Sequence, residues 1–172
     1  HRVTLTLPPP TRHSPPMPDD LWLTDTYTWS LQQADLLRRL RAGERPKDLD
    51  WDNIIEEIES VGRSHKDQVE SLVVQSALHL MKIHAWPDST ALRKWRADAR
   101  DFLIQAQRIY RPSMARDLDL AGAYRYALRR IPYDRFTTAP QPVPTNGTIP
   151  LAAVADEDFS IDDLAAALFP PR

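Results

Sequence analysis

Cysteine is absent from this 172-residue sequence. A chain without cysteine cannot form disulfides, use a thiolate as a nucleophile or bind zinc through sulfur. Its composition fits a reducing compartment, so we expect a cytoplasmic protein.

Glycine and long apolar runs are also scarce. Only 4 glycines are present, and they form no glycine-rich phosphate loop. No apolar run approaches the ~20 residues that cross a bilayer, so we expect no membrane segment. Prolines near the N-terminus replace the apolar part of a secretory signal. The net charge of -2 is too small to predict a nucleic-acid or membrane partner for the whole chain.

Proline, in contrast, is abundant and unevenly placed. Of the 16 prolines, 11 fall within residues 8–18 and 132–150. Proline lacks an amide donor and clashes inside a helix, so both zones should be extended or irregular, and the middle of the chain should be helical. We predict that residues 1–18 are a proline-rich leader or tag outside the fold, with a genuine proline-rich arm as the alternative. Residues 19–172 suit a single helical domain.

Apolar spacing and capping residues predict an all-α bundle of about five main helices. They are expected at about 25–42, from 50 to about 62, and at 65–85, 89–110 and 113–131. A short last helix should begin at Ser160, after the proline-rich loop. The third helix is apolar on two sides between Val69 and Ile83, which predicts a central position.

The second predicted helix has one apolar face at helical spacing, which we expect to face the core: Trp51, Ile54, Ile55, Ile58 and Val61. Gly62 falls on the same face. This glycine should either end the helix or let another helix pass close to it. Whether the second and third helices are separate or form one kinked helix is open at this stage.

Several short motifs occur in a recognisable order: Asp25-Thr-Tyr-Thr-Trp29, Leu49-Asp50, Ile54-Ile-Glu-Glu-Ile-Glu-Ser-Val-Gly-Arg63, His79-Leu-Met-Lys82, Trp95-Arg96 and Phe159-Ser-Ile-Asp-Asp-Leu164. Together they resemble the bacterial domain of unknown function 29 family, over about residues 21–170. The chain departs from the family pattern after Lys82, where a turn rich in glutamine or aromatic residues is usual. The resemblance implies an all-helical fold and no particular activity.

The acidic segment around Glu57 has two interpretations. Glu56, Glu59 and Arg63 suit a solvated face of the second helix, with weak pairs between successive turns. Glu57 lies at the boundary of the apolar face, where it could meet the next helix and pair with His79. His79 lies in a narrow polar strip of the third helix, and we expect it to be a hydrogen-bonded structural histidine.

A catalytic alternative uses the same residues. A metal-assisted hydrolase or nuclease would employ Glu57 and His79, with Asp25 or Asp50 as further ligands from neighbouring segments. A divalent metal belongs only to this alternative, and we otherwise predict no cofactor. His84 points about 140° away from His79 on one helix, so the two histidines do not suit a single metal centre.

A second alternative rests on arginines in the fourth and fifth predicted helices. Those that share a face are Arg93, Arg96 and Arg100 on one helix, and Arg125 and Arg129 on the other. Such a patch could bind nucleic acid or an acidic partner. The acidic tail, with Asp156, Glu157, Asp158, Asp162 and Asp163, could instead neutralise it from within.

The sequence has many apolar positions that suit a core and no complete group of catalytic residues, which favours a non-catalytic function over these alternatives. We expect a small soluble helical interaction or regulatory module without catalysis. It should have a protein partner, and a homo-oligomer is compatible with the sequence.

Overall fold

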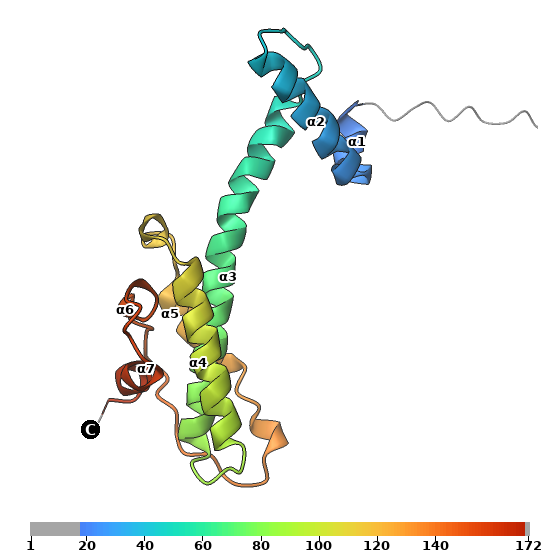
Figure 1. The fold of residues 1–172 in the computed structure, drawn as a ribbon. Helices are drawn as coiled ribbons and strands as arrows, with labels where there is room; N and C mark the ends of the chain where they lie inside the picture. The colour runs from blue at the N-terminus through green and yellow to red at the C-terminus, as the bar shows by residue number, and fades with distance from the viewer. Residues whose placement is uncertain (1–17, 171–172) are drawn as a thin grey trace, which may run out of the picture. The chain divides into compact units, whose positions relative to one another are not determined.

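In the computed structural model, residues 18–170 are described, and within this range the chain forms helices and loops without a strand. The helices are α1 Pro18–Thr24, α2 Thr26–Arg41, α3 Trp51–Ala85, α4 Leu92–Ile109, η1 Pro112–Met114, α5 Leu120–Arg129, η2 Tyr133–Arg135, α6 Ala152–Ala155 and α7 Ile161–Leu168 (Figure 1). The predicted all-α fold is therefore confirmed. The predicted leader lies outside the described residues, except for Pro18, which begins α1. Each helix in the described range is too short or too polar to span a membrane.

The chain divides into two compact units by its internal contacts. The first extends to Glu59 and the second begins at Ser60, so α3 starts in one unit and continues into the other. The single domain predicted for residues 19–172 thus contains two compact units that share a helix.

The first unit is held together by a small buried group. Helices α1 and α2 pack on each other, and Trp29, Gln33 and Ile54 are buried. The indole Nε1 of Trp29 donates to Oδ2 of Asp50 at 2.9 Å, and the amide of Asp50 donates to Oε1 of Gln33 at 2.9 Å. These two bonds join α2 to the start of α3.

Helix α2 begins and ends close to where the sequence predicts. Asp25 caps it, since its carboxylate accepts a hydrogen bond from the amide of Thr28 at 3.0 Å. Ser30 lies inside the helix, so the helix is continuous from Thr26 to Arg41. Gly43 follows with a φ of 92°, a backbone conformation that favours glycine, and so ends the helix.

Helix α3 is continuous through Gly62, so the second and third predicted helices are one helix. Neither expected role of Gly62 occurs. The glycine does not end the helix, and a Cβ atom added there would meet nothing within 4 Å. A single glycine costs a helix only ~1 kcal/mol relative to alanine, which the neighbouring turns can offset.

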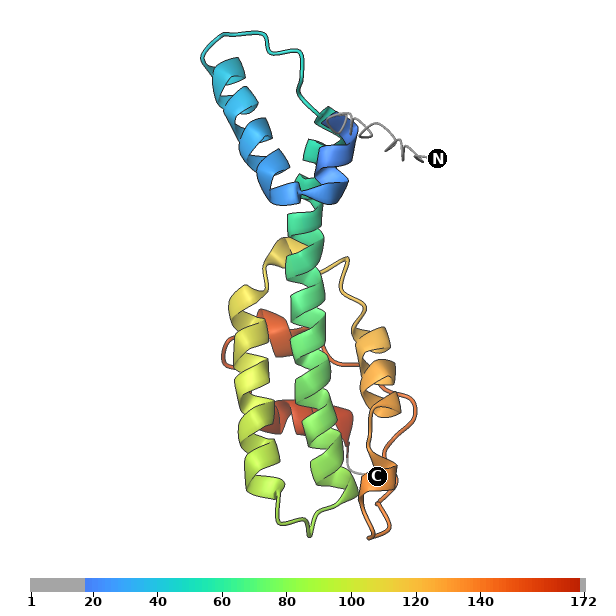
Figure 2. The same ribbon diagram turned by 90° about the vertical axis from the view of Figure 1, so that its right-hand side faces the viewer.

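The second unit is built around the later part of α3. Val69, Val73, Ala77 and Met81 are fully buried, which confirms the predicted central position. Figure 2 shows α4 and α5 on opposite sides of this part of α3. Buried Ser76 of α3 donates to a main-chain carbonyl of α4 at 2.8 Å.

The C-terminal helices lie against α4. Ser160 and Asp163 form the reciprocal cap that begins α7, as predicted. The side-chain amide of Gln107 on α4 donates to the carbonyl oxygens of Ala153, Asp156 and Phe159 at 2.9–3.1 Å. The short helix α6 was not predicted. Helix α5 begins after its cap Asp119 rather than at Ser113, because residues 112–114 form a separate 3₁₀ turn.

Candidate functional site

Glu57 does not meet His79, so the expected acid–imidazole pair is wrong. The carboxylate of Glu57 accepts a hydrogen bond from the indole Nε1 of Trp22 at 3.1 Å. Glu57 and His79 lie on one continuous helix, where a rise of ~1.5 Å per residue separates them by roughly 33 Å along the axis. The prediction failed because it treated one long helix as two that could fold against each other.

His79 is instead tied into the contact between α3 and α4. Its Nδ1 lies 2.8 Å from the carbonyl oxygen of Gln75, so Nδ1 carries the proton and donates. Its Nε2 lies 3.5 Å from Oδ2 of Asp98, and its ring packs at a tilt against Phe102. The histidine is therefore hydrogen-bonded, as a half-buried polar side chain should be.

Burial decides the protonation of His79, and the polar and charged groups around it modify the effect. Burial lowers the pKa of His79, and the neighbouring ammonium groups of Lys82 and Lys94 act in the same direction. The Gln75 carbonyl and the Asp98 carboxylate act the other way, and burial prevails. The Lys94 ammonium donates to Asp98 at 2.5 Å and holds the pKa of that carboxyl below its usual value. The imidazole is consequently neutral at pH 7, and its Nε2 lone pair faces the ion pair of Lys94 and Asp98.

This arrangement predicts a pH dependence of stability. The unfolded chain binds a proton at His79 near pH 6.5, whereas the folded chain binds it only at lower pH. Protonation below pH 6.5 therefore favours the unfolded state, so stability should fall as the pH drops toward the lowered native pKa. We expect His79→Gln to remove this component when denaturant unfolding is measured from pH 8 to pH 5. If the variant loses more stability on acidification than the wild type, the ion pair with Asp98 outweighs burial and the assignment is wrong.

Asp25 and Asp50, the remaining metal-ligand candidates, serve as hydrogen-bond acceptors at helix starts. Hydrogen bonds from the hydroxyl and amide of Thr28 lower the pKa of Asp25. Burial acts to raise the pKa of Asp50, but hydrogen bonds from Asn53 and Trp29 hold it below its usual value. In the part of the chain that the structure describes, no group of three or more acidic or histidine side chains is placed to hold a metal ion. Glu57, His79, Asp25 and Asp50 thus form no common centre.

The predicted arginine patch on α4 is partly neutralised from within. Arg96 pairs with both carboxylate oxygens of Asp162 in the acidic tail, at 2.6 and 2.7 Å. Arg93 and Arg100 are exposed on the same helix. The acidic tail therefore forms an ion pair with one of the three α4 arginines that were expected to share a binding patch.

The two arginines of α5 line an open groove of about 720 Å³ between α3 and α5. Arg125 lies 3.9 Å from Asp119, and the guanidinium of Arg129 lies over the exposed ring of Tyr126 at 5.6 Å. The opposite side of the groove is acidic, with Asp67 and Glu70. A groove with one basic and one acidic side is poorly suited to a polyanion such as nucleic acid.

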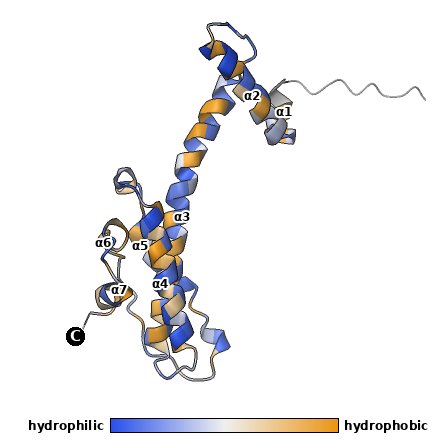
Figure 3. Cartoon of the chain, viewed as in Figure 1, coloured by the Kyte–Doolittle hydropathy of each residue, from blue (hydrophilic) through white to orange (hydrophobic). Residues whose placement is uncertain are grey.

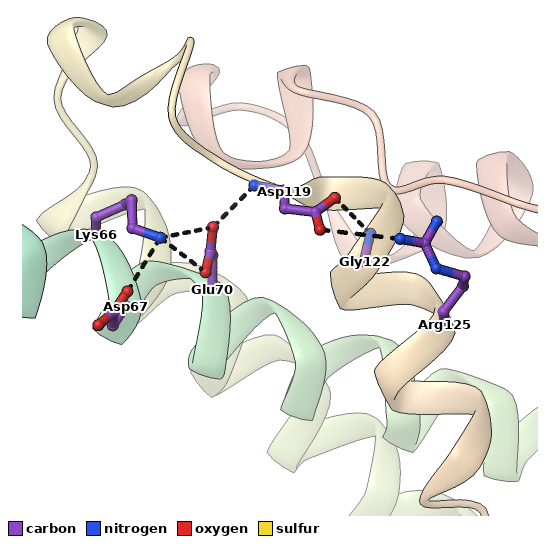
Figure 4. A network of polar contacts seen from close by, with 6 residues as sticks. All are labelled: Lys66, Asp67, Glu70, Asp119, Gly122 and Arg125. Atoms are coloured by element: carbon purple, nitrogen blue, oxygen red, sulfur yellow. Dashed lines mark hydrogen bonds and ion pairs between the residues drawn. The ribbon is translucent and has the colours of Figure 1, made fainter.

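A polar network at the end of this groove joins α3 to the start of α5 (Figure 4). Glu70 accepts from the amide of Asp119 at 2.8 Å and from the ammonium of Lys66 at 3.2 Å. Asp119 in turn accepts from the amide of Gly122 at 2.7 Å and so caps α5. Sequence reasoning missed this network, because no local pattern links residues 70 and 119. Its groups satisfy one another, which marks it as a structural element.

Among residues 18–170, no element covers one apolar face of α3, which we term the exposed α3 stripe. Its residues are Trp51, Ile55, Ile58 and Val61, whose exposed fractions are 52%, 52%, 68% and 58%. Figure 3 shows hydrophobic residues recurring along this part of the helix. The sequence predicted that this face packs on the core, and only Ile54 does so. The apolar spacing correctly identified one face of a helix, but spacing alone does not show which element covers that face.

Residues 21–160 match the family described as domain of unknown function DUF29. The chain belongs to this family. The DUF29 assignment agrees with the motifs noted in the sequence. The chain is also similar to the crystal structure, at 1.45 Å resolution, of an alpha-helical protein of unknown function from Rhodospirillum rubrum ATCC 11170. The two are 30% identical with a TM-score of 0.65, over 87% of this chain and 98% of that one. A comparison with curated proteins finds no match.

Proposed function

We propose that this DUF29 protein is a non-catalytic interaction module whose docking surface is the exposed α3 stripe. The carrying observation is the continuous row of large apolar side chains, half or more exposed, on a well-formed helix. Single exposed apolar residues are ordinary, but a row at helical spacing is typical of a protein-binding surface. This function needs no cofactor, and the cysteine-free composition favours the cytoplasm.

The spacing along the stripe indicates what kind of partner fits. Trp51, Ile55 and Ile58 are separated by four and three residues, the spacing at which one helix packs lengthwise on another. A partner helix with an apolar face could therefore lie along α3 and bury the stripe.

The charges beside the stripe narrow the partner further. Residues 50–59 contain five acidic side chains and no lysine or arginine: Asp50, Asp52, Glu56, Glu57 and Glu59. A partner helix flanked by basic side chains would meet this segment favourably, whereas an acidic one would be repelled.

Substitution of Ile58 tests the proposal. Ile58→Glu places a charge in the centre of the stripe. Loss of a central hot-spot contact costs about 2 kcal/mol or more, so we expect binding at least about tenfold weaker. Tagged chain should be crosslinked in the cells that produce it, the captured protein purified, and its affinity for each variant measured. An endogenous copy of the chain counts as a captured protein.

The matched control is Ile104→Glu, which changes an isoleucine of similar exposure, 47%, on α4. We expect the control to bind as the wild type does. Equal binding by both glutamate variants would show that the stripe is not the docking surface.

A further inference from the structure

We propose that Lys82 is a site of N-acylation, at which a small acyl phosphate transfers its acyl group to the side-chain Nζ atom. This lysine closes the motif His79-Leu-Met-Lys82, and the docking function proposed above does not use it. The surroundings of Lys82 between α3 and α4 support the assignment independently of that function.

Lys82 lies in a contact that gives its ammonium group little stabilisation. The side chain is half-buried, and Nζ lies over the ring of Trp95, 4.8 Å from the centroid. Among residues 18–170, no hydrogen bond or ion pair engages this ammonium. The carboxylate of Asp98 attracts it from α4, but that carboxylate is already paired with Lys94. The amine is therefore held in a partly desolvated position without a counter-charge of its own.

These surroundings favour the neutral amine, which is the nucleophilic form of a lysine. Burial lowers the pKa of Lys82, the Asp98 carboxylate opposes this effect, and the Lys94 ammonium adds to it. A larger share of this amine is therefore free of its proton at neutral pH than is usual for lysine. Desolvation and a neighbouring cation are features that activate nucleophilic lysines in enzymes. The side chain remains partly open to solvent, so a small electrophile can reach it.

The same burial selects acylation among the reactions of an amine. Nζ attacks the carbonyl carbon of the acyl phosphate, an N–C bond forms, and the bond from that carbon to the phosphate oxygen breaks. The phosphate leaves with the bonding electrons and takes up the proton that the nitrogen loses. The product is a neutral amide, so the cost of holding a charge in a half-buried position disappears. Condensation with an aldehyde would give an imine that is charged when protonated, and burial opposes that form.

The other lysines of the chain provide internal references: Lys47, Lys66 and Lys94. Lys66 is held as an ammonium by two carboxylates, and Lys94 is held by Asp98. Lys47 is exposed on the segment between α2 and α3. Exposure alone would thus favour acylation of Lys47 or Lys94, whereas the surroundings favour Lys82.

The first test treats the full chain with acetyl phosphate at pH 8 and measures the initial rate at each lysine by peptide mass spectrometry. We expect Lys82 to be acetylated several-fold faster than Lys47, and Lys66 and Lys94 more slowly than either. As the pH rises, the rate at Lys82 should reach its plateau below pH 10.5, the ordinary pKa of lysine. Acetylation of Lys82 that is no faster than that of Lys47, or is absent, would overturn the assignment.

The second test follows the loss of charge at Lys82 through His79. Burial lowers the pKa of His79 and the Lys82 ammonium adds to this effect, so a neutral side chain at position 82 should raise that pKa. We expect the NMR titration of the His79 ring to move to higher pH in Lys82→Gln, whose amide resembles the acylated side chain. Lys47→Gln is the matched control and should leave the titration unchanged. An unmoved His79 titration in Lys82→Gln would place the ammonium outside this group of charges, and the inference would fail.

Discussion

Tyr124→Ala should destabilise the second unit by about 3–5 kcal/mol, the cost typical of removing a large aromatic side chain from a core. Tyr124 is fully buried, and its hydroxyl donates a hydrogen bond to the carbonyl oxygen of Pro144 at 2.6 Å. Burial raises the pKa of the phenol. The ring also packs against Gly147 so closely that a Cβ there would lie 2.6 Å from its Cζ. The alanine variant loses this packing and leaves a cavity beside the loop.

Guanidinium unfolding measures the effect as a lower midpoint at a similar slope. Tyr124→Phe is the matched control, because it keeps the ring and removes only the hydrogen bond, at about 1 kcal/mol. A loss in the alanine variant no larger than that in the phenylalanine variant would show that the ring contributes little packing.

Trp86→Ala has the second large expected effect, again about 3–5 kcal/mol. Trp86 is buried just after the end of α3, and its indole Nε1 donates to the carbonyl oxygen of Thr138 at 2.9 Å. Its ring stacks on Phe136 at 4.1 Å between centroids. The indole thus fastens the segment from Phe136 to Gln141 to the end of α3, where Gln141 also donates to the carbonyl of Ala85 at 2.7 Å.

Limited proteolysis together with denaturant unfolding checks this second prediction. The alanine variant should be cut within residues 136–141 far sooner than the wild type, since the loop loses its aromatic anchor. Trp86→Phe, which retains stacking but loses the indole hydrogen bond, should fall between the two. Resistance to cleavage equal to that of the wild type in Trp86→Ala would mean that the loop is held by other contacts.

The features of the fold that could be predicted from the sequence are those set by neighbouring residues. The caps Asp25 and Ser160 act on amides two or three residues ahead, so their roles can be recognised locally. The two-sided apolar pattern from Val69 to Ile83 correctly identified a segment buried on both sides.

Two features that were predicted wrongly or missed depend on residues far apart in the chain. Glu57 pairs with Trp22, and Glu70 binds the amide of Asp119, and neither contact leaves a local pattern. Gly62 was expected to end the helix or to let another helix pass close, because glycine disfavours a helix. The helical turns on either side of Gly62 nevertheless keep α3 continuous. The exposed stripe shows the same limit, since an apolar face looks alike in sequence whether its own chain or another covers it.

The side-chain amide of Gln107 donates to three main-chain carbonyl oxygens, and this sharing affects how the C-terminal segment unfolds. Ala153 lies in α6, Phe159 directly precedes the cap of α7, and Asp156 lies between the two helices. One primary amide on α4 is thus the common anchor of two separate turns, and neither turn can detach without weakening the hold on the other. The C-terminal segment should consequently detach from α4 and return to it as one cooperative unit, and its two helices should not fray separately.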